Sequence, residues 1–217
     1  MKKRNPERKS KSSATFHRKT KETDISVSLK LDGKKRPAAA DINTPIGFMN
    51  HMLEAFSCHG GFCLKVKATG DTQVDDHHTV EDLGICLGED LKKIIKKGKG
   101  LTRFGSAVIP MDEALALVAI DISGRPFLSF KVEFSAIRKS DFDFRLIEDF
   151  FRAVSNTAGI TIHVISLGGR DNHHMSEAVF KAFGIALGRA LASSGKGIPS
   201  TKGLIRKGTG LMEGDRS

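Results

Sequence analysis

The sequence contains no tryptophan and no tyrosine, and it holds only three cysteines. Proteins that bind single-stranded nucleic acids stack bases on exposed aromatic side chains, so this shortage argues against that class. The cysteines, Cys58, Cys63 and Cys86, form no CxxC pair and are odd in number. Neither a disulfide framework nor a cysteine-based zinc site is therefore expected, and a reducing cytoplasm is the expected location.

Long hydrophobic runs are also missing. No apolar stretch approaches the ~18 residues that a membrane-spanning helix needs, and residues 1–21 lack the apolar core of a secretory signal. Hydrophobic residues make up 39% and charged residues 28% of the 217 positions, a composition typical of a polar globular protein. This length suits one large domain or two small halves.

Positive charge is concentrated at one end of the chain. The net charge is +10, yet nine lysines and arginines fall within residues 1–21 against a single acidic residue, Glu7. The remainder is nearly balanced, with 26 basic and 24 acidic residues. We therefore predict a disordered basic tail over residues 1–17, with an interaction arm or a remnant targeting peptide as the alternatives.

The sequence resembles itself. Residues 48–70 align with residues 146–168 at an offset of 98, and residues 77–91 align with residues 173–187 at an offset of 96. Apolar positions coincide in both alignments, for example Leu64 with Ile162 and Val66 with Val164. The chain therefore contains two similar halves, which we expect at 18–98 and 99–194, followed by a C-terminal tail at 195–217.

Hydrophobic periodicity predicts an α/β (α+β) fold. Residues 25–31 and 62–68 alternate apolar and polar side chains, as half-buried strands do, whereas residues 48–59 and 80–94 carry apolar stripes of helical period. Residues 107–109, 114–122 and 127–134 read as strands, and Gly124 and Pro126 indicate a hairpin turn between the last two. Strands and helices therefore alternate along both halves.

Each half contains an adjacent pair of histidines followed by a glutamate. The first histidine and the glutamate are four residues apart and share one face of a helix. The second histidine is rotated by ~100° and must face another centre. Imidazole and carboxylate ligands without thiolate favour Mn²⁺, Fe²⁺ or Zn²⁺, with oxygen-rich coordination leaning toward Mn²⁺. The residues are His77, His78 and Glu81 in the first half, and His173, His174 and Glu177 in the second.

The repeat extends this hypothesis to a further pair. His51 aligns with Asp149, so the two would supply matching ligands to two metal ions, each completed from elsewhere in the fold or from another subunit. A single His-His-x-x-Glu could be no more than a polar helix start, and Asp149 could be a solvated helix residue. Two copies in register favour the metal interpretation. His163 lies on the polar face of a strand and is expected at the surface.

These residues resemble one known family, the imidazoleglycerol-phosphate dehydratases of histidine biosynthesis, in the form without a phosphatase half. The resemblance covers residues 18–203. It is carried by RxTxETDI (18–25), HMLxxFxxHGGF (51–62), DDHHTVED (75–82), RFGxAxxPMDEAL (103–115), DISGRP (121–126), HHxxEAxFKA (173–182) and PSTKG (199–203).

The resemblance implies a fold, an assembly and a reaction. Members of the family are similar in having a helical layer between two four-stranded mixed sheets, the ribosomal S5 domain 2-like arrangement. They assemble as hollow 24-subunit shells with sites between subunits and two Mn²⁺ per active site. The implied activity is a hydro-lyase reaction that converts D-erythro-imidazoleglycerol phosphate to imidazole-acetol phosphate, with the metal as a Lewis acid. A small phosphorylated substrate is the expected partner, with no nucleic acid and no membrane.

The resemblance also implies roles for particular residues. Glu22 matches an acidic residue near the reacting carbons and is the candidate general acid/base, and His77 and Glu177 are expected to take part in catalysis. The implied substrate-binding residues are Glu22, His51, His59, Arg103, Arg125, Lys181, Ser200, Thr201 and Lys202. The implied metal ligands are His51, His77, His78, Glu81, His173, His174 and Glu177, to which the internal repeat adds Asp149.

Two positions depart from the family pattern. The family usually has histidine where this chain has Asp149, and aspartate where this chain has Asn50. A carboxylate in place of a neutral imidazole adds negative charge and should shift metal preference. Asn50 would weaken an acceptor that orients His51. We expect activity to be retained.

Two other function classes compete with the dehydratase. A binuclear metal-dependent phosphate-ester hydrolase would use the same ligands and would release inorganic phosphate. An RNA-associated protein would bind through the basic tail and lose affinity steeply with salt. Neither accounts for the PSTKG segment and the two arginine-containing blocks.

Overall fold

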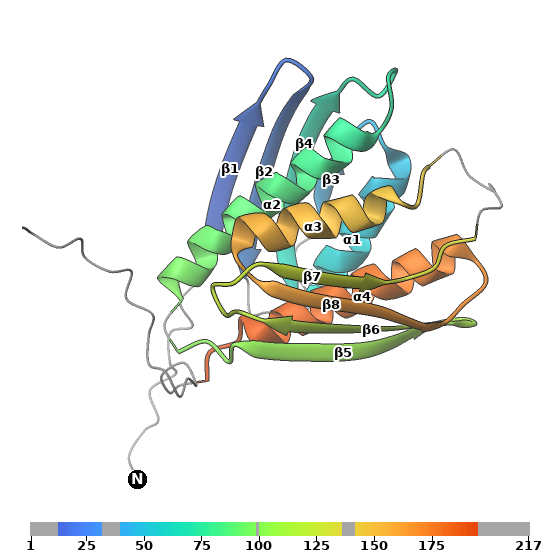
Figure 1. Ribbon diagram of the computed structural model, residues 1–217. Coiled ribbons are helices and arrows are strands. Elements are labelled where there is room, and N and C mark those ends of the chain that lie inside the picture. Colours follow the sequence, from blue (N-terminus) through green and yellow to red (C-terminus); the bar gives the residue numbers. More distant parts are fainter. Residues whose placement is uncertain (1–12, 32–39, 99, 136–141, 195–217) are drawn as a thin grey trace, which may run out of the picture.

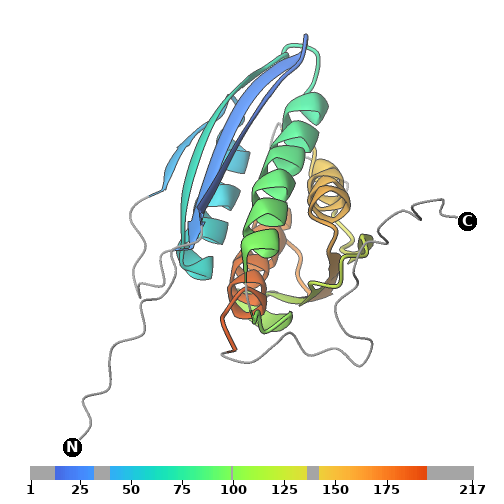
Figure 2. The same ribbon diagram turned by 90° about the vertical axis from the view of Figure 1, so that its left-hand side faces the viewer.

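The protein is described by a computed structural model that covers residues 13–31, 40–98, 100–135 and 142–194. Two four-stranded sheets enclose a layer of helices (Figures 1 and 2), which confirms the predicted fold class. The first sheet comprises β1 (Ser13–Lys19), β2 (Thr23–Leu31), β3 (Asp41–Asn43) and β4 (Phe62–Gly70), and the second β5 (Phe104–Met111), β6 (Ala114–Asp121), β7 (Phe127–Lys131) and β8 (Thr161–Gly168). The helices are α1 (Gly47–Gly60), α2 (His77–Lys97), α3 (Leu146–Ala158) and α4 (Asn172–Ala190).

The two sheets share one topology. Their strand orders are β1-β2-β4-β3 and β5-β6-β8-β7, antiparallel except for the last strand, which pairs in parallel. The predicted hairpin at Gly124 and Pro126 is therefore wrong, because β7 does not pair with β6. The loop after β6 passes β8 instead, and β7 pairs in parallel with the far edge of β8. Turn residues mark a reversal of the chain but do not decide which strand the next one pairs with.

The alternation of buried and half-exposed side chains along the strands explains why each sheet covers the helices with one face. Ile25, Val27 and Leu29 of β2 are buried, and the residues between them are half-exposed. Val118 and Ile120 of β6 are buried in the same alternating pattern. Because side chains of a strand point alternately to opposite faces, one apolar face per sheet is enough to close the core.

The helices pack crosswise between the halves. α1 contacts α4, and α2 contacts α3, so each pair joins a helix of the first half to one of the second. Gly61 ends α1 with a φ of 70°, a left-handed conformation that glycine adopts without steric cost. Gly159 ends α3 in the same way. The repeated sequence therefore produces an interlocked pair of halves.

One contact differs between the two sheets. Gly105 of β5 is paired with Ile120, and a Cβ atom at Gly105 would lie 2.0 Å from the carbonyl oxygen of Ala186 on α4. In the first sheet the corresponding strand position, opposite Leu29, is Ala14. The absence of a side chain at Gly105 therefore lets α4 lie directly on the backbone of β5.

The first strand lies partly inside the predicted tail. β1 begins at Ser13, so residues 13–17 are not the disordered extension that was expected. Ala14 is buried and Phe16 packs against the core, while Lys93 of α2 donates to the carbonyl oxygen of Thr15 at 2.7 Å. Only two apolar side chains alternate here, which hid the strand among the basic residues. Residues 1–12 and 195–217 lie outside the described residues.

Two buried carboxylates lie on α2. Asp82 accepts from Arg18 at 2.8 Å and from the hydroxyl of Thr23 at 2.5 Å, which fastens β1 and β2 to the helix. Asp90 has no solvent-exposed surface and accepts the backbone N–H of Leu29 at 3.2 Å. Burial raises the pKa of Asp90 to about 6. Among the described residues, no helix is both long enough and apolar enough to span a membrane.

Candidate metal centres

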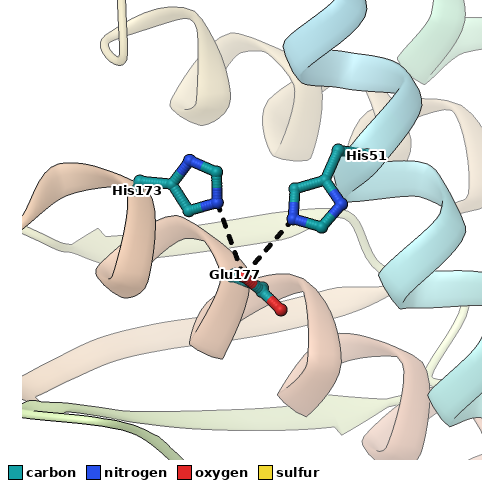
Figure 3. A group of neighbouring side chains, drawn as sticks. All are labelled: His51, His173 and Glu177. Atoms are coloured by element: carbon teal, nitrogen blue, oxygen red, sulfur yellow. Dashed lines mark hydrogen bonds and ion pairs between the residues drawn. The ribbon is translucent and has the colours of Figure 1, made fainter. Parts of the chain in front are cut away.

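The start of α4 and the middle of α1 together form the first candidate centre. His51 Nε2 and His173 Nε2 lie 3.4 Å and 3.5 Å from Glu177 Oε2 (Figure 3). One ligand atom from each residue falls within 4.8 Å of the other two. We call this group the α1–α4 centre. Two imidazole nitrogens and a carboxylate oxygen directed at one point form a donor set suited to a divalent transition metal.

Local structure accounts for the orientation of this group. His173 and Glu177 are one helical turn apart, as predicted, and Asp171 accepts the backbone N–H of His173 at 2.8 Å where α4 begins. The ring of Phe48 meets the His173 ring edge to face, with centroids 5.6 Å apart. These contacts orient His173 toward Glu177 without any bound ion.

A lysine and a further histidine lie beside the α1–α4 centre. Lys181 Nζ is 2.8 Å from Glu177 Oε1, and both side chains are largely buried, at 16% and 12% exposure. Burial alone would raise the pKa of Glu177, but the hydrogen bonds and charges of Lys181 and His51 outweigh it and lower that pKa. Burial, with the charge of Lys181, lowers the pKa of His59. Two of the predicted substrate-binding residues therefore border this centre.

The second candidate centre joins α2 and α3. Glu81 Oε2 lies 3.6 Å from His77 Nε2, and Asp149 Oδ2 lies 3.7 Å from His77 Nδ1. The two carboxylates meet different nitrogens of one ring, so these groups do not converge on one point as those of the α1–α4 centre do. We call His77, Glu81 and Asp149 the α2–α3 centre. Its side chains are 38–49% exposed. They adjoin a cavity of about 710 Å³ that is lined by Thr72, Asp75, Asp76, His77, Asp143, Arg145, Leu146 and Asp149.

The second histidine of each pair turns away from its centre, as the helical rotation predicts, and meets a carboxylate. His78 Nδ1 is 3.1 Å from Asp71 Oδ2, and His174 Nδ1 is 2.8 Å from Glu113 Oε2. These hydrogen bonds raise the pKa of His78 and of His174. A carboxylate on Nδ1 directs Nε2 of the same ring toward a metal, an arrangement common in metal sites.

Sequence reasoning missed both of these carboxylates. Glu113 accepts the backbone N–H groups of Arg170 and Asp171, and these bonds, after that of His174, lower the pKa of Glu113 to about 2. Asp71 follows β4 directly, and Glu113 immediately precedes β6. Both stand at a strand end next to the start of a His-His helix. Glu113 is 61 residues from His174 and reaches it through the sheet topology, whereas Asp71 lies only seven residues before His78.

The candidate acid/base Glu22 lies between β1 and β2, with Oε2 3.9 Å from His78 Nδ1. Its side chain is 55% exposed, so a small substrate can reach it. Asn50, in contrast, does not take the predicted position beside His51. Its side chain accepts from the backbone and hydroxyl of Thr44 and donates to the Thr44 carbonyl, which fastens the loop before α1.

Among the predicted phosphate-binding residues that the structure describes, Lys181 lies at the α1–α4 centre and Arg103 does not. The backbone N–H of Arg103 donates to Ala190 at the C-terminal end of α4, and the Arg103 guanidinium pairs with Asp121 at 2.7 Å. His173 stands at the opposite end of the same helix, about 25 Å away at 1.5 Å per residue. Arg125 lies in the loop between β6 and β7. Ser200, Thr201 and Lys202 lie outside the described residues.

Comparison with known proteins places these observations in one family. The sequence model of imidazoleglycerol-phosphate dehydratase matches residues 44–187. The chain is 51% identical over 194 residues to the imidazoleglycerol-phosphate dehydratase of Methanocella arvoryzae, covering 89% of this chain and 99% of that protein. The enzyme of the same name from Thermodesulfovibrio yellowstonii is 52% identical over 192 residues, covering 88% and 98%.

Solved structures agree with the sequence relatives. The crystal structure of imidazoleglycerol-phosphate dehydratase from Staphylococcus aureus superimposes with a TM-score of 0.74 at 42% identity, covering 84% of this chain and 99% of that one. The Pyrococcus furiosus enzyme in complex with (S)-C348 gives a TM-score of 0.76 at 37% identity, covering 88% and 100%. Because the family model matches residues 44–187 and relatives of this name are about half identical over nearly nine tenths of the chain, the chain belongs to the imidazoleglycerol-phosphate dehydratase family.

Proposed function

We propose that this protein is a hydro-lyase that dehydrates D-erythro-imidazoleglycerol phosphate to imidazole-acetol phosphate in histidine biosynthesis, with two Mn²⁺ per active site. The observation that carries the proposal is the pair of centres on crossed helices, each with imidazole and carboxylate groups in reach of one another. Membership of the family supports the substrate and the reaction.

The residues present fit such a metal. Imidazole and carboxylate donors without thiolate suit Mn²⁺, and the carboxylates on His78 and His174 are the outer contacts that metal-binding histidines usually have. Bound Mn²⁺ would supply Lewis-acid stabilisation of negative charge on the substrate imidazole. The ligands in this proposal are His51, His77, His78, Glu81, Asp149, His173, His174 and Glu177.

The chain's own residues would perform the proton transfers and hold the substrate. The reaction breaks the C2–H and C3–O bonds, the C3 hydroxyl leaves as water, and the resulting enol becomes a ketone. Glu22 is the general acid/base in this proposal because its exposed carboxylate stands beside His78. His77 and Glu177 position the reacting imidazole, and His59 and Lys181 contact the substrate next to the α1–α4 centre.

The substrate phosphate needs convergent cations, and among the described residues Lys181 lies at the α1–α4 centre whereas Arg103 does not. Arg103 lies at the opposite end of α4 from His173, and Arg125 lies beyond β6. We therefore place the complete active site between subunits of a homo-oligomer, with the 24-subunit shell as the proposed assembly. Ser200, Thr201 and Lys202 complete the phosphate site in this proposal, and the cytoplasm is the proposed location.

The test is an assay of the purified full chain with imidazoleglycerol phosphate, following ketone and inorganic phosphate together. Mn²⁺-loaded protein should produce ketone without phosphate, and chelator-treated protein should be inactive until Mn²⁺ is restored. Release of phosphate would favour the metal-dependent phosphate-ester hydrolase instead. Failure to turn over with both metals bound would disprove the dehydratase assignment.

A further inference from the structure

The internal repeat relates the two metal centres, but the charged residues around them differ. We infer, on the basis of the proposed function, that the two Mn²⁺ positions of this chain are unequal: the α2–α3 centre fills first, and the α1–α4 centre fills only at a higher Mn²⁺ concentration. Two independent differences between the centres carry this inference.

The first difference is a lysine on α4. Lys181 Nζ lies 2.8 Å from Glu177 Oε1, in an ion pair that is largely buried. A metal ion at the α1–α4 centre must share Glu177 with this ammonium group and lie close to its positive charge. The repeat-related position on α2 is Ile85, so Glu81 meets no such competitor there. Buried charges interact strongly because water screens them poorly.

The second difference is the number of carboxylates. Asp149 stands where the α1–α4 centre has His51, and Asp76 stands where α4 has Asn172. Both aspartates line the cavity beside His77. Arg145 also lines this cavity, but its guanidinium is paired with Asp143. Negative charge without a competing lysine therefore gathers at the α2–α3 centre.

The outward-turned histidines do not offset these differences. His78 faces Asp71 and Glu22, while His174 faces Glu113 and Asp112, so each has two carboxylates within 4 Å. Whichever centre each of them completes, it brings a similar charge. The inequality therefore originates in residues 76, 85, 149 and 181, and the α1–α4 centre sets the Mn²⁺ concentration at which both positions are filled.

The experiment is a Mn²⁺ titration of the metal-free full chain, in which electron paramagnetic resonance measures the free ion. We expect two classes of site with dissociation constants that differ by roughly tenfold or more, a factor typical of a single altered charge at short range. Glu81→Gln should remove the tighter class and Glu177→Gln the weaker one. Lys181→Met should tighten the weaker class, whereas Lys92→Met, at an ion pair away from both centres, should leave it unchanged.

Asp149 provides a second route to the same test. Asp149→His and Asp149→Asn should both weaken the tighter class, and agreement between them would identify charge as the cause. One class of equal sites, loss of the tighter class in Glu177→Gln, or unchanged constants in Lys181→Met would overturn the inference. Turnover is measured separately on the same samples, so a failure of the dehydratase proposal and a failure of this one are distinguishable.

Discussion

The two halves of the molecule differ most where the fold constrains them least. The outer face of the first sheet is polar, with Ser26, Ser28, Lys65 and Lys67 on its central strands. The outer face of the second sheet exposes Phe104, Val108, Phe127 and Leu167, each more than half exposed or close to it. Inward-facing positions remain apolar in both sheets, because the shared helical layer must be covered on both sides.

The same rule applies to the metal centres. The core requires the α1–α4 and α2–α3 helix pairs, and within them α2 and α4 each carry a histidine and a glutamate four residues apart. The residues around these pairs have diverged, with Lys181 on one side and Ile85, Asp76 and Asp149 on the other. The two halves therefore keep the same helices and the same histidine–glutamate spacing, while the charged residues beside them differ.

The largest expected effect comes from breaking the α1–α4 centre. Glu177→Gln removes the carboxylate that meets both His51 and His173, and should lower kcat/KM by about 10³-fold, since several kcal/mol of charge stabilisation depend on this position. Steady-state kinetics at saturating Mn²⁺ measures it. Glu89→Gln, on the ion pair of α2 that is remote from both centres, is the control. Near-normal kcat/KM in Glu177→Gln would contradict the proposed site.

A second prediction compares how much stability each sheet loses when the side chain at one matched strand position is changed. Gly105→Ala should reduce the free energy of unfolding by about 3 kcal/mol, because the new Cβ meets the backbone of α4 and cannot be accommodated by a rotamer change. The matched variant Ala14→Gly, at the corresponding position of the first sheet, should cost only about 1 kcal/mol. Chemical denaturation measures both. A loss of about 1 kcal/mol or less in Gly105→Ala would instead mean that α4 leaves room for a side chain at this position, as the first sheet does at Ala14.

A third change compares the carboxylates that hold the outward-turned histidines. Glu113→Gln should weaken Mn²⁺ binding about 10- to 100-fold, as loss of an outer contact to a metal-binding histidine usually does. Asp71→Asn should have a smaller effect, because its contact with His78 is longer, at 3.1 Å against 2.8 Å. Metal titration of the two variants tests this order, and a larger effect at Asp71 would reverse it.

The smallest expected effect is a pH dependence of the free energy of unfolding, which comes from a residue of the first half without a titratable counterpart in the second. Asp90 is buried with a raised pKa of about 6, and the repeat places Ala186 at its counterpart. The folded state holds this proton more tightly than the unfolded state does, so stability is fully present below about pH 4 and falls as the pH rises through about 6. Asp90→Asn should remove this fall in the free energy of unfolding. Denaturation midpoints at pH 4, 5, 6 and 7 measure it; an unchanged slope would exclude Asp90 as its source.

The sequence alone predicted those features of the fold and the site that depend on hydrophobic periodicity and on the internal repeat. The stop at Gly61, the helix starts near His77 and His173, and the four-residue spacing of histidine and glutamate are local properties, and the structure confirms them. The parallel pairing of β7 with β8 was missed because pairing depends on residues far apart in the chain. Glu113 was missed for the same reason, since topology alone brings it to His174, 61 residues along the chain. Asp71 lies only seven residues before His78, so the sequence could have suggested this contact.

The separation of Arg103 from His173 along α4 has a genetic consequence. If each active site takes its metal centre from one chain and its arginines from another, two different inactive alleles can rescue each other. Chains with Glu177→Gln and chains with Arg103→Ala, each inactive alone, would recover part of the activity when they assemble together, because some interfaces combine an intact centre with an intact arginine. Intragenic complementation in a histidine auxotroph would thus report whether the proposed site combines residues of two chains.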